Sequence, residues 1–142
     1  RKWPDSYYIG YFQANTNTYA PLPVLKEKYE TILSLPNVVG LNIATRSDAI
    51  TEECYDYLEE LSKRTNLIVE LGLQSIHEKT LKFINRGHNL ANFETAVKEL
   101  QRRKMQLRYI IIHSHFPLLM PMTILKYSLL QDICCTHYWF LL

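Results

Sequence analysis

Four short, almost continuous apolar segments constrain the fold of this chain more than any other feature. They are rich in β-branched and aromatic residues and span Tyr7–Phe12, Val38–Ala44, Leu67–Leu73 and Leu107–Ile112. Such runs are typical of strands buried on both faces, as in a parallel sheet covered by helices. The segments begin about 31, 29 and 40 residues apart, which leaves room for the crossover that consecutive parallel strands require.

Helical periodicity fills the intervals between these segments. The apolar stripes are Leu25, Tyr29, Ile32 and Leu33, then Cys54, Tyr57, Leu58 and Leu61, then Phe93, Ala96, Val97 and Leu100. Pro36 ends the first helix, and Thr51 is the expected N-cap of the second. The third interval predicts a short helix over Glu78–Asn85 and a longer one over Ala91–Lys104. The fold class is therefore α/β, and the period alone fits both a partial β/α barrel and a doubly wound sheet.

The C-terminal segment differs from the rest of the chain. Only two of the 30 charged residues, Lys126 and Asp132, lie after residue 113. We therefore expect two parts, with central βα repeats over residues 1–113 and an atypical apolar tail over residues 114–142. An exposed apolar tail is expected to be poorly packed or to mediate self-association.

The charge balance carries little information about partners. The formal net charge is +2, from 16 basic and 14 acidic side chains, which gives no general argument for nucleic acid or an acidic partner. The densest basic cluster, Arg102–Lys104, ends a predicted helix, so we expect it to form a solvated face that matches the helix dipole.

The cysteines and the absence of a leader point to the cytoplasm. Cys54, Cys134 and Cys135 cannot form a paired disulfide framework, which favours a reducing compartment. No apolar run is long enough for a transmembrane helix, so no membrane association is expected. The chain starts at Arg1 without a methionine, and we expect it to begin inside a longer protein.

Polar clusters follow the predicted strands. They are Gln13–Thr18, Thr45–Asp48, Gln74–His77 and His113–His115. Functional groups of parallel β/α folds collect at the carboxyl ends of strands. The alternative is ordinary loop chemistry, because Asn, Asp, Ser and Thr also cap helices and form turns.

Glu70 stands inside a predicted buried strand, where a carboxylate is costly unless it has a partner. We expect either a structural salt bridge, for example to Arg46, or a ligand contact in the barrel mouth. His113 and His115 could together hold a metal ion, but two histidines without a third ligand are a weak signal. No metal site is predicted for this chain.

Four motifs, in order, resemble the radical S-adenosylmethionine (SAM) superfamily over residues 1–112. They are Tyr11-Phe-Gln-Ala-Asn-Thr-Asn-Thr-Tyr19, Gly40-Leu-Asn-Ile-Ala-Thr-Arg-Ser-Asp48, Val69-Glu-Leu-Gly-Leu-Gln-Ser75 and Ile84-Asn-Arg-Gly-His88. Within that superfamily the strings are most similar to the bacterial YtqA/YhcC-like branch, which is related to the catalytic subunit of Elongator.

The resemblance implies a partial (β/α) barrel of the radical SAM type, with about four of its parallel strands in this chain. It implies that SAM and a 4Fe-4S cluster lie in the barrel mouth, where SAM is cleaved reductively to a deoxyadenosyl radical. The cofactor-binding residues that it implies are Gln13, Asn15, Thr16, Gln74, Ser75 and Arg86. A planar guanidinium such as that of Arg86 suits the SAM carboxylate. The substrate stays unknown, although kinship with Elongator hints at RNA modification and a tRNA partner.

The chain departs from the family in one respect that decides its activity. The family binds its cluster through a C-x3-C-x2-C loop after the first barrel strand, and this sequence has no such loop. We therefore expect an enzyme fragment that is inactive alone, with cluster ligands in the parent protein. The alternatives are a non-catalytic β/α binding or scaffold module and, last, a metal-dependent hydrolase that uses His113 and His115.

Overall fold

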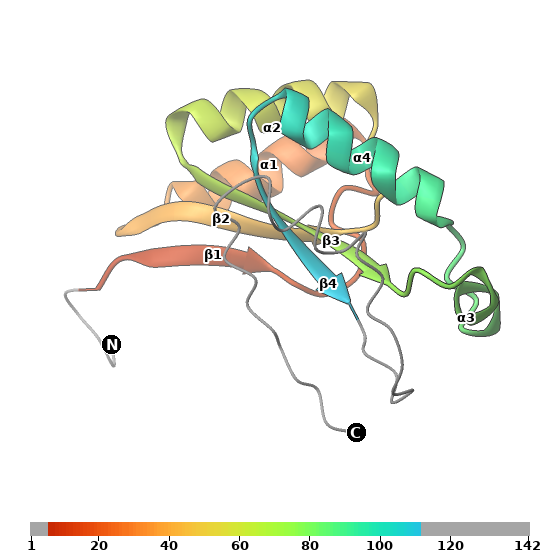
Figure 1. Ribbon diagram of the computed structural model, residues 1–142. Coiled ribbons are helices and arrows are strands. Elements are labelled where there is room, and N and C mark those ends of the chain that lie inside the picture. The colour runs from red at the N-terminus through yellow and green to blue at the C-terminus, as the bar shows by residue number, and fades with distance from the viewer. Residues whose placement is uncertain (1–5, 112–142) are drawn as a thin grey trace.

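The computed structural model describes residues 6–111, which form an α/β fold (Figure 1). The elements are β1 (Tyr8–Phe12), α1 (Leu22–Leu33), β2 (Val38–Thr45), α2 (Glu52–Arg64), β3 (Asn66–Gln74), α3 (Glu78–Phe83), α4 (Leu90–Arg102) and β4 (Gln106–Ile111). The predicted tail, 114–142, and the pair His113 and His115 lie outside the described residues. None of the helices over residues 6–111 has the length and apolar character needed to cross a bilayer.

The four strands form one parallel sheet in the order β1-β2-β3-β4. Helices α1, α2 and α4 lie over one face of this sheet, and α3 stands apart from that layer, beyond the end of β3 (Figure 1). The predicted parallel direction is confirmed, and each end of a strand differs from the prediction by at most one residue. The carboxyl ends of all four strands consequently lie along one edge.

The helix-facing side of the sheet carries the core. Its fully buried side chains include Leu41 and Ile43 of β2 and Val69 and Leu71 of β3. The predicted stripes of α2 and α4 pack there, and every member of both stripes is buried. Residues between these positions face the opposite side, which places polar Asn42 and Glu70 away from the helices.

Local signals explain where the helices start and end. The Thr51 hydroxyl accepts the Cys54 backbone N–H at 3.3 Å, which confirms the predicted N-cap of α2. Asn89 and Asn92 form a reciprocal capping box at the start of α4. Helix α1 ends at Leu33, ahead of Pro36.

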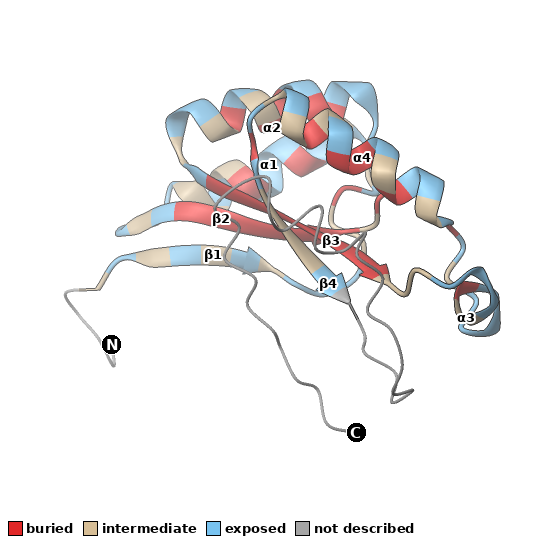
Figure 2. Ribbon diagram, in the orientation of Figure 1, coloured by how far each residue is buried: buried red, intermediate tan, exposed pale blue. Residues whose placement is uncertain are grey.

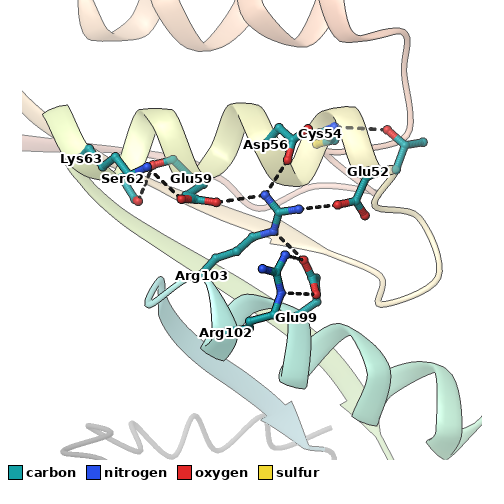
Figure 3. Close-up of polar contacts among 10 residues, drawn as sticks. Glu52, Cys54, Asp56, Glu59, Ser62, Lys63, Glu99, Arg102 and Arg103 are labelled. Carbon is teal, nitrogen blue, oxygen red and sulfur yellow. Dashed lines mark hydrogen bonds and ion pairs between the residues drawn. The ribbon is translucent and has the colours of Figure 1, made fainter.

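The predicted solvated face at the end of α4 is wrong for Arg103. Its side chain is only 4% exposed, whereas that of Arg102 is 65% exposed. The Arg103 guanidinium binds four carboxylates of two helices (Figure 3), namely Glu52, Asp56, Glu59 and Glu99. It also lies over the Tyr55 ring, with its Cζ 5.6 Å from the centroid. Arg103 therefore joins α2 to α4, because its fork has donors for several carboxylates at once.

Replacing Arg103 with Met should lower Tm by about 4–8 °C in thermal unfolding. This is the shift that a loss of about 1 kcal/mol in unfolding free energy causes in a domain of this size. The change leaves four carboxylates without their shared cation. Arg102→Met is the matched control and should have a smaller effect, since that exposed side chain has Glu99 as its one ion-pair partner among the described residues. Equal effects of the two variants would contradict the role of Arg103.

Arg102 and Arg103 hydrogen bonds hold the pKa of Glu99 at about 2, below its ordinary 4.5. Because the folded-state pKa is depressed, the stabilisation is present above about pH 4.5 and is lost as the pH falls toward about 2. The Tm difference between Arg103→Met and the wild type should shrink over that interval.

Candidate functional site

Three of the four predicted polar clusters meet at one edge of the sheet, at the carboxyl ends of β1, β2 and β3. The fourth lies outside the described residues. The loop after β1 is fixed to β2 by Asn17, whose Nδ2 donates to the carbonyls of Phe12 and Ala44, both at 2.8 Å. The Thr18 hydroxyl donates to the Ala49 carbonyl at 2.6 Å. Part of this cluster is therefore loop chemistry.

The β1 loop also carries three of the residues that the family resemblance implies as cofactor-binding. Gln13 and Asn15 are exposed and Thr16 is half-buried. Asn15 adopts a left-handed backbone with φ 67°, a conformation that asparagine tolerates better than most residues. The structure places these three residues at the same edge as Gln74, and it gives no direct contact between the two groups.

Gln74 and Arg86 come together over Gly72. A methyl group built on Gly72 would lie 2.8 Å from Gln74 Nε2 and 2.8 Å from an Arg86 terminal nitrogen. Both donor groups therefore occupy the space that a side chain at position 72 would fill. Gly72 lies two residues after Glu70 on β3, so both positions face the same side of the sheet. The space over Gly72 therefore lies on the side away from the helices. The expected proximity of Gln74 and Arg86 is thus present in the structure.

Arg86 lies in the loop between α3 and α4. Helix α3 ends at Phe83, two residues before the end of the short helix predicted over Glu78–Asn85. One terminal nitrogen donates to the Gly72 carbonyl at 2.8 Å. The Nε atom is buried, and within the described residues it has no hydrogen-bond partner. Burial lowers the pKa of Arg86, and the positive charge of Arg46 lowers it further. The guanidinium is thus partly desolvated, and among residues 6–111 it forms no ion pair with a carboxylate.

Ser75 has a structural contact that the sequence did not predict. Its hydroxyl accepts the His77 backbone N–H at 3.2 Å. Gln74 precedes it with φ 69°, at a point where the pairing of β3 with β4 shifts register. The chain thus bends sharply after Gly72, which turns the end of β3 toward α3.

A second pair of loops interlocks beside Arg86. Arg46 forms two hydrogen bonds with Asp48, at 2.9 and 2.6 Å. A methyl group built on Gly87, which has φ 81°, would lie 3.0 Å from the Arg46 guanidinium. Ser47 Oγ and His88 Nδ1 are 3.4 Å apart, and both residues are buried. These contacts hold the loop after β2 against the loop that carries Arg86. The sequence did not predict that His88 is buried in this site. Its position at the end of the Ile84–His88 motif was the one feature that could have indicated it.

Glu70 does not pair with Arg46, so that predicted alternative is wrong: Arg46 is held by Asp48. Instead the Tyr11 hydroxyl donates to the Glu70 carboxylate at 3.0 and 3.2 Å, and Asn42 Nδ2 donates at 3.1 Å. Tyr11, Asn42 and Glu70 come from three adjacent strands. They form a polar cluster on the side of the sheet away from the helices.

Within residues 6–111 no group of three His, Cys, Asp or Glu side chains is arranged to hold a metal ion. Cys54, on the core-facing side of α2, is buried, and burial raises the pKa of its thiol to about 11. A thiol held protonated in this way is a poor ligand for iron. The other two cysteines lie outside the described residues.

Comparison with known proteins identifies the class to which this arrangement belongs. The sequence model described as Radical SAM superfamily matches residues 2–126. The chain therefore belongs to the radical SAM superfamily, and its four parallel strands are consistent with a partial radical SAM β/α fold. SAM and a 4Fe-4S cluster are accordingly implied for the parent proteins of this family.

The chain is similar to three curated relatives. It is 48% identical over 112 residues to the uncharacterized protein YtqA of Bacillus subtilis (strain 168), covering 79% of this chain and 35% of the relative. It is 40% identical over 108 residues to the uncharacterized protein MJ0486 of Methanocaldococcus jannaschii (75% and 33%). It is 38% identical over 101 residues to the protein YhcC of Escherichia coli (strain K12) (70% and 33%).

The chain thus spans about a third of the length of these relatives. No solved structure matches it significantly. The kinship with the Elongator subunit stays a prediction, because none of these comparisons tests it.

The His88 ring should remain neutral at pH 7 and titrate below its ordinary pKa of 6.5, since burial and the Arg86 charge both disfavour the imidazolium. The unfolded chain then binds the extra proton, so stability is lost as the pH falls below about 6.5. NMR titration of the ring tests this directly. In His88→Gln the loss of urea stability between about pH 7 and pH 5 should be smaller. A measured pKa at or above 6.5 would contradict the assignment.

Proposed function

We propose that this chain is a segment of a radical SAM enzyme and contributes the residues that bind the methionine end of SAM. The observation that carries this proposal is the pair of donors over Gly72, Gln74 Nε2 and the Arg86 guanidinium. The Nε of Arg86 supports it: this buried donor has no acceptor in the part of the chain that the structure describes, which is costly unless a ligand supplies one.

The donor set fits a carboxylate. A guanidinium offers parallel N–H groups that match two carboxylate oxygens, and the Gln74 amide adds a further donor beside it. Burial strengthens such a contact, since Arg86 is partly withdrawn from water before any ligand arrives. The residues of the β1 loop, Gln13, Asn15 and Thr16, have oxygens that would accept from the ammonium of the same ligand. Ser75 would contribute mainly by fixing the turn that carries Gln74.

When SAM and the cluster are bound together, the chemistry supplied is reductive cleavage of the sulfonium to a deoxyadenosyl radical. The residues of this chain would hold and orient the amino-acid end of the ligand. The cluster ligands would come from outside the described residues, because Cys54 is buried in the core. We propose that the chain alone is inactive, because it lacks the cluster-binding cysteine loop.

Anaerobic reconstitution of the chain with iron and sulfide tests the cluster part of this proposal. The three-cysteine loop is missing from the sequence, so no stable 4Fe-4S cluster should assemble. Iron analysis and the visible absorption of the cluster report the outcome. A stoichiometric 4Fe-4S cluster on the 142-residue chain would refute this part of the proposal.

Binding of SAM by calorimetry tests the carboxylate site. Arg86→Ala should weaken SAM binding by about 1.5–3 kcal/mol, the scale of a hydrogen bond to a charged group. Decarboxylated SAM, which lacks the carboxylate, should bind the wild type and Arg86→Ala almost equally. Arg102→Ala, the matched control on the exposed end of α4, should leave SAM binding unchanged.

Equal weakening of both ligands by Arg86→Ala would show that the variant acts through loop structure and not through the carboxylate. Wild-type chain that does not bind SAM would favour the non-catalytic β/α module instead.

A further inference from the structure

Helix α3 has an outward face that the proposed SAM site does not use. Leu81 is 3% exposed and anchors the helix, whereas Phe83 is 90% exposed, more than any other large apolar side chain that the structure describes. In Figure 2 this helix stands apart from the helical layer and is coloured mostly as exposed. A single exposed aromatic ring is common on protein surfaces. The residues around Phe83 make this one unusual.

The face of α3 is basic as well as aromatic. Lys79 lies one helical turn before Phe83, so the two share a face. Lys82 lies three residues after Lys79 and is therefore its neighbour on the helix surface. Both lysines are exposed, and neither belongs to an ion pair in the part of the chain that the structure describes. The one carboxylate of α3, Glu78, is directed at the first turn of α4, where it accepts the Leu90 backbone N–H at 3.5 Å.

A polar hollow of about 440 Å³ continues this face toward the sheet. Lys82, Asn85, Arg86 and Asn92 line it together with the Glu78 carboxylate. Two cationic side chains thus face one carboxylate where α3 meets the start of α4. A second hollow, between the segments that follow β1 and β2, is lined by the 82% exposed Tyr19 together with Asp48.

We propose that the outward face of α3 binds a single-stranded polynucleotide, with Phe83 stacked on a base and Lys79 and Lys82 on phosphates. Aromatic rings interleaved with cations are what single strands require, because every base has a stackable face and every linkage a negative charge. The evidence is local and is consistent with a net charge of only +2 for the whole chain. The inference rests on the proposed function only for the role of the strand, which would be the substrate presented to the SAM site.

Fluorescence anisotropy with a labelled single-stranded RNA of about 15 nucleotides, in the absence of SAM, tests the surface. Phe83→Ala should weaken binding roughly 5- to 150-fold, the scale of one base stacked on an aromatic ring. Tyr7→Ala is the control. Tyr7 is also an exposed ring, at 77%, but it precedes β1 and so lies away from the carboxyl edge of the sheet; its removal should change affinity less than about twofold. Equal effects of these two variants, or no binding by the wild type at low salt, would overturn the proposal.

The salt dependence tests the lysines. The double variant Lys79→Gln/Lys82→Gln should reduce the slope of log affinity against log salt by about 1.4, because each phosphate contact on a single strand contributes about 0.7. Lys28→Gln/Lys98→Gln carries the same net charge, alters exposed lysines on α1 and α4, and should leave the slope nearly unchanged. Equal slopes in the two double variants would show a diffuse charge effect and would overturn the assignment of this face.

Two further arms complete the test. Single-stranded DNA should bind like RNA, since the face reads bases and phosphates, and an RNA duplex should bind more weakly because its bases are already stacked. A duplex that binds equally well would refute the role of Phe83. Failure of the SAM site is seen separately, because Phe83→Ala should retain wild-type SAM binding in calorimetry, and Arg86→Ala should lose it.

Discussion

The parallel pairing of β2 with β3 is the constraint on which the rest of the structure depends. It runs from Gly40 opposite Asn66 to Thr45 opposite Leu71, and it aligns the carboxyl ends of both strands at one edge. Gly40 permits this pairing, since a side chain there would collide with the Asn66 backbone carbonyl. The same register places the end of β2, which Arg46 follows, next to β3, which ends at Gln74. The predicted clusters can therefore form one site although they are distant in sequence.

The site combines a loop that is held in place by several contacts with a guanidinium, that of Arg86, whose hydrogen-bonding capacity is not fully used in the described residues. Arg46, Ser47, Gly87 and His88 lock the loop that precedes α4, so Arg86 has a defined position. Its guanidinium nevertheless keeps a buried Nε without a partner in the described residues. A fold tolerates such a group when a ligand completes it, because preorganised donors bind more strongly than donors that must first be ordered. This combination distinguishes Arg86 from Arg103, whose hydrogen bonds are satisfied within the protein.

Periodicity and capping residues were sufficient to predict the elements. The four strands, the Thr51 cap and the buried stripe from Phe93 to Leu100 all depend on local sequence. Long-range side-chain contacts were not predictable in this way. From the sequence, Arg103 was predicted to be a solvated residue at a helix end. In the structure it binds Asp56 and Glu59 of α2, which are 47 and 44 residues away in the sequence. Glu70 likewise finds Tyr11, 59 residues away, and not Arg46. The family motifs implied that Gln74 and Arg86 belong to one site. Only the structure shows that the absence of a side chain at Gly72 leaves room for both.

The most direct test of the account is the NMR signal of the Arg86 Nε–H group, followed while SAM is added to the chain. The account predicts that this resonance shifts progressively with SAM and stays almost in place with decarboxylated SAM, since the carboxylate is the missing acceptor. The Arg103 Nε–H signal, whose group already donates to Glu99 at 2.6 Å, serves as the internal reference and should not move. An Arg86 Nε–H resonance that does not shift at saturating SAM, or that shifts equally with SAM and decarboxylated SAM, would contradict the proposed carboxylate site.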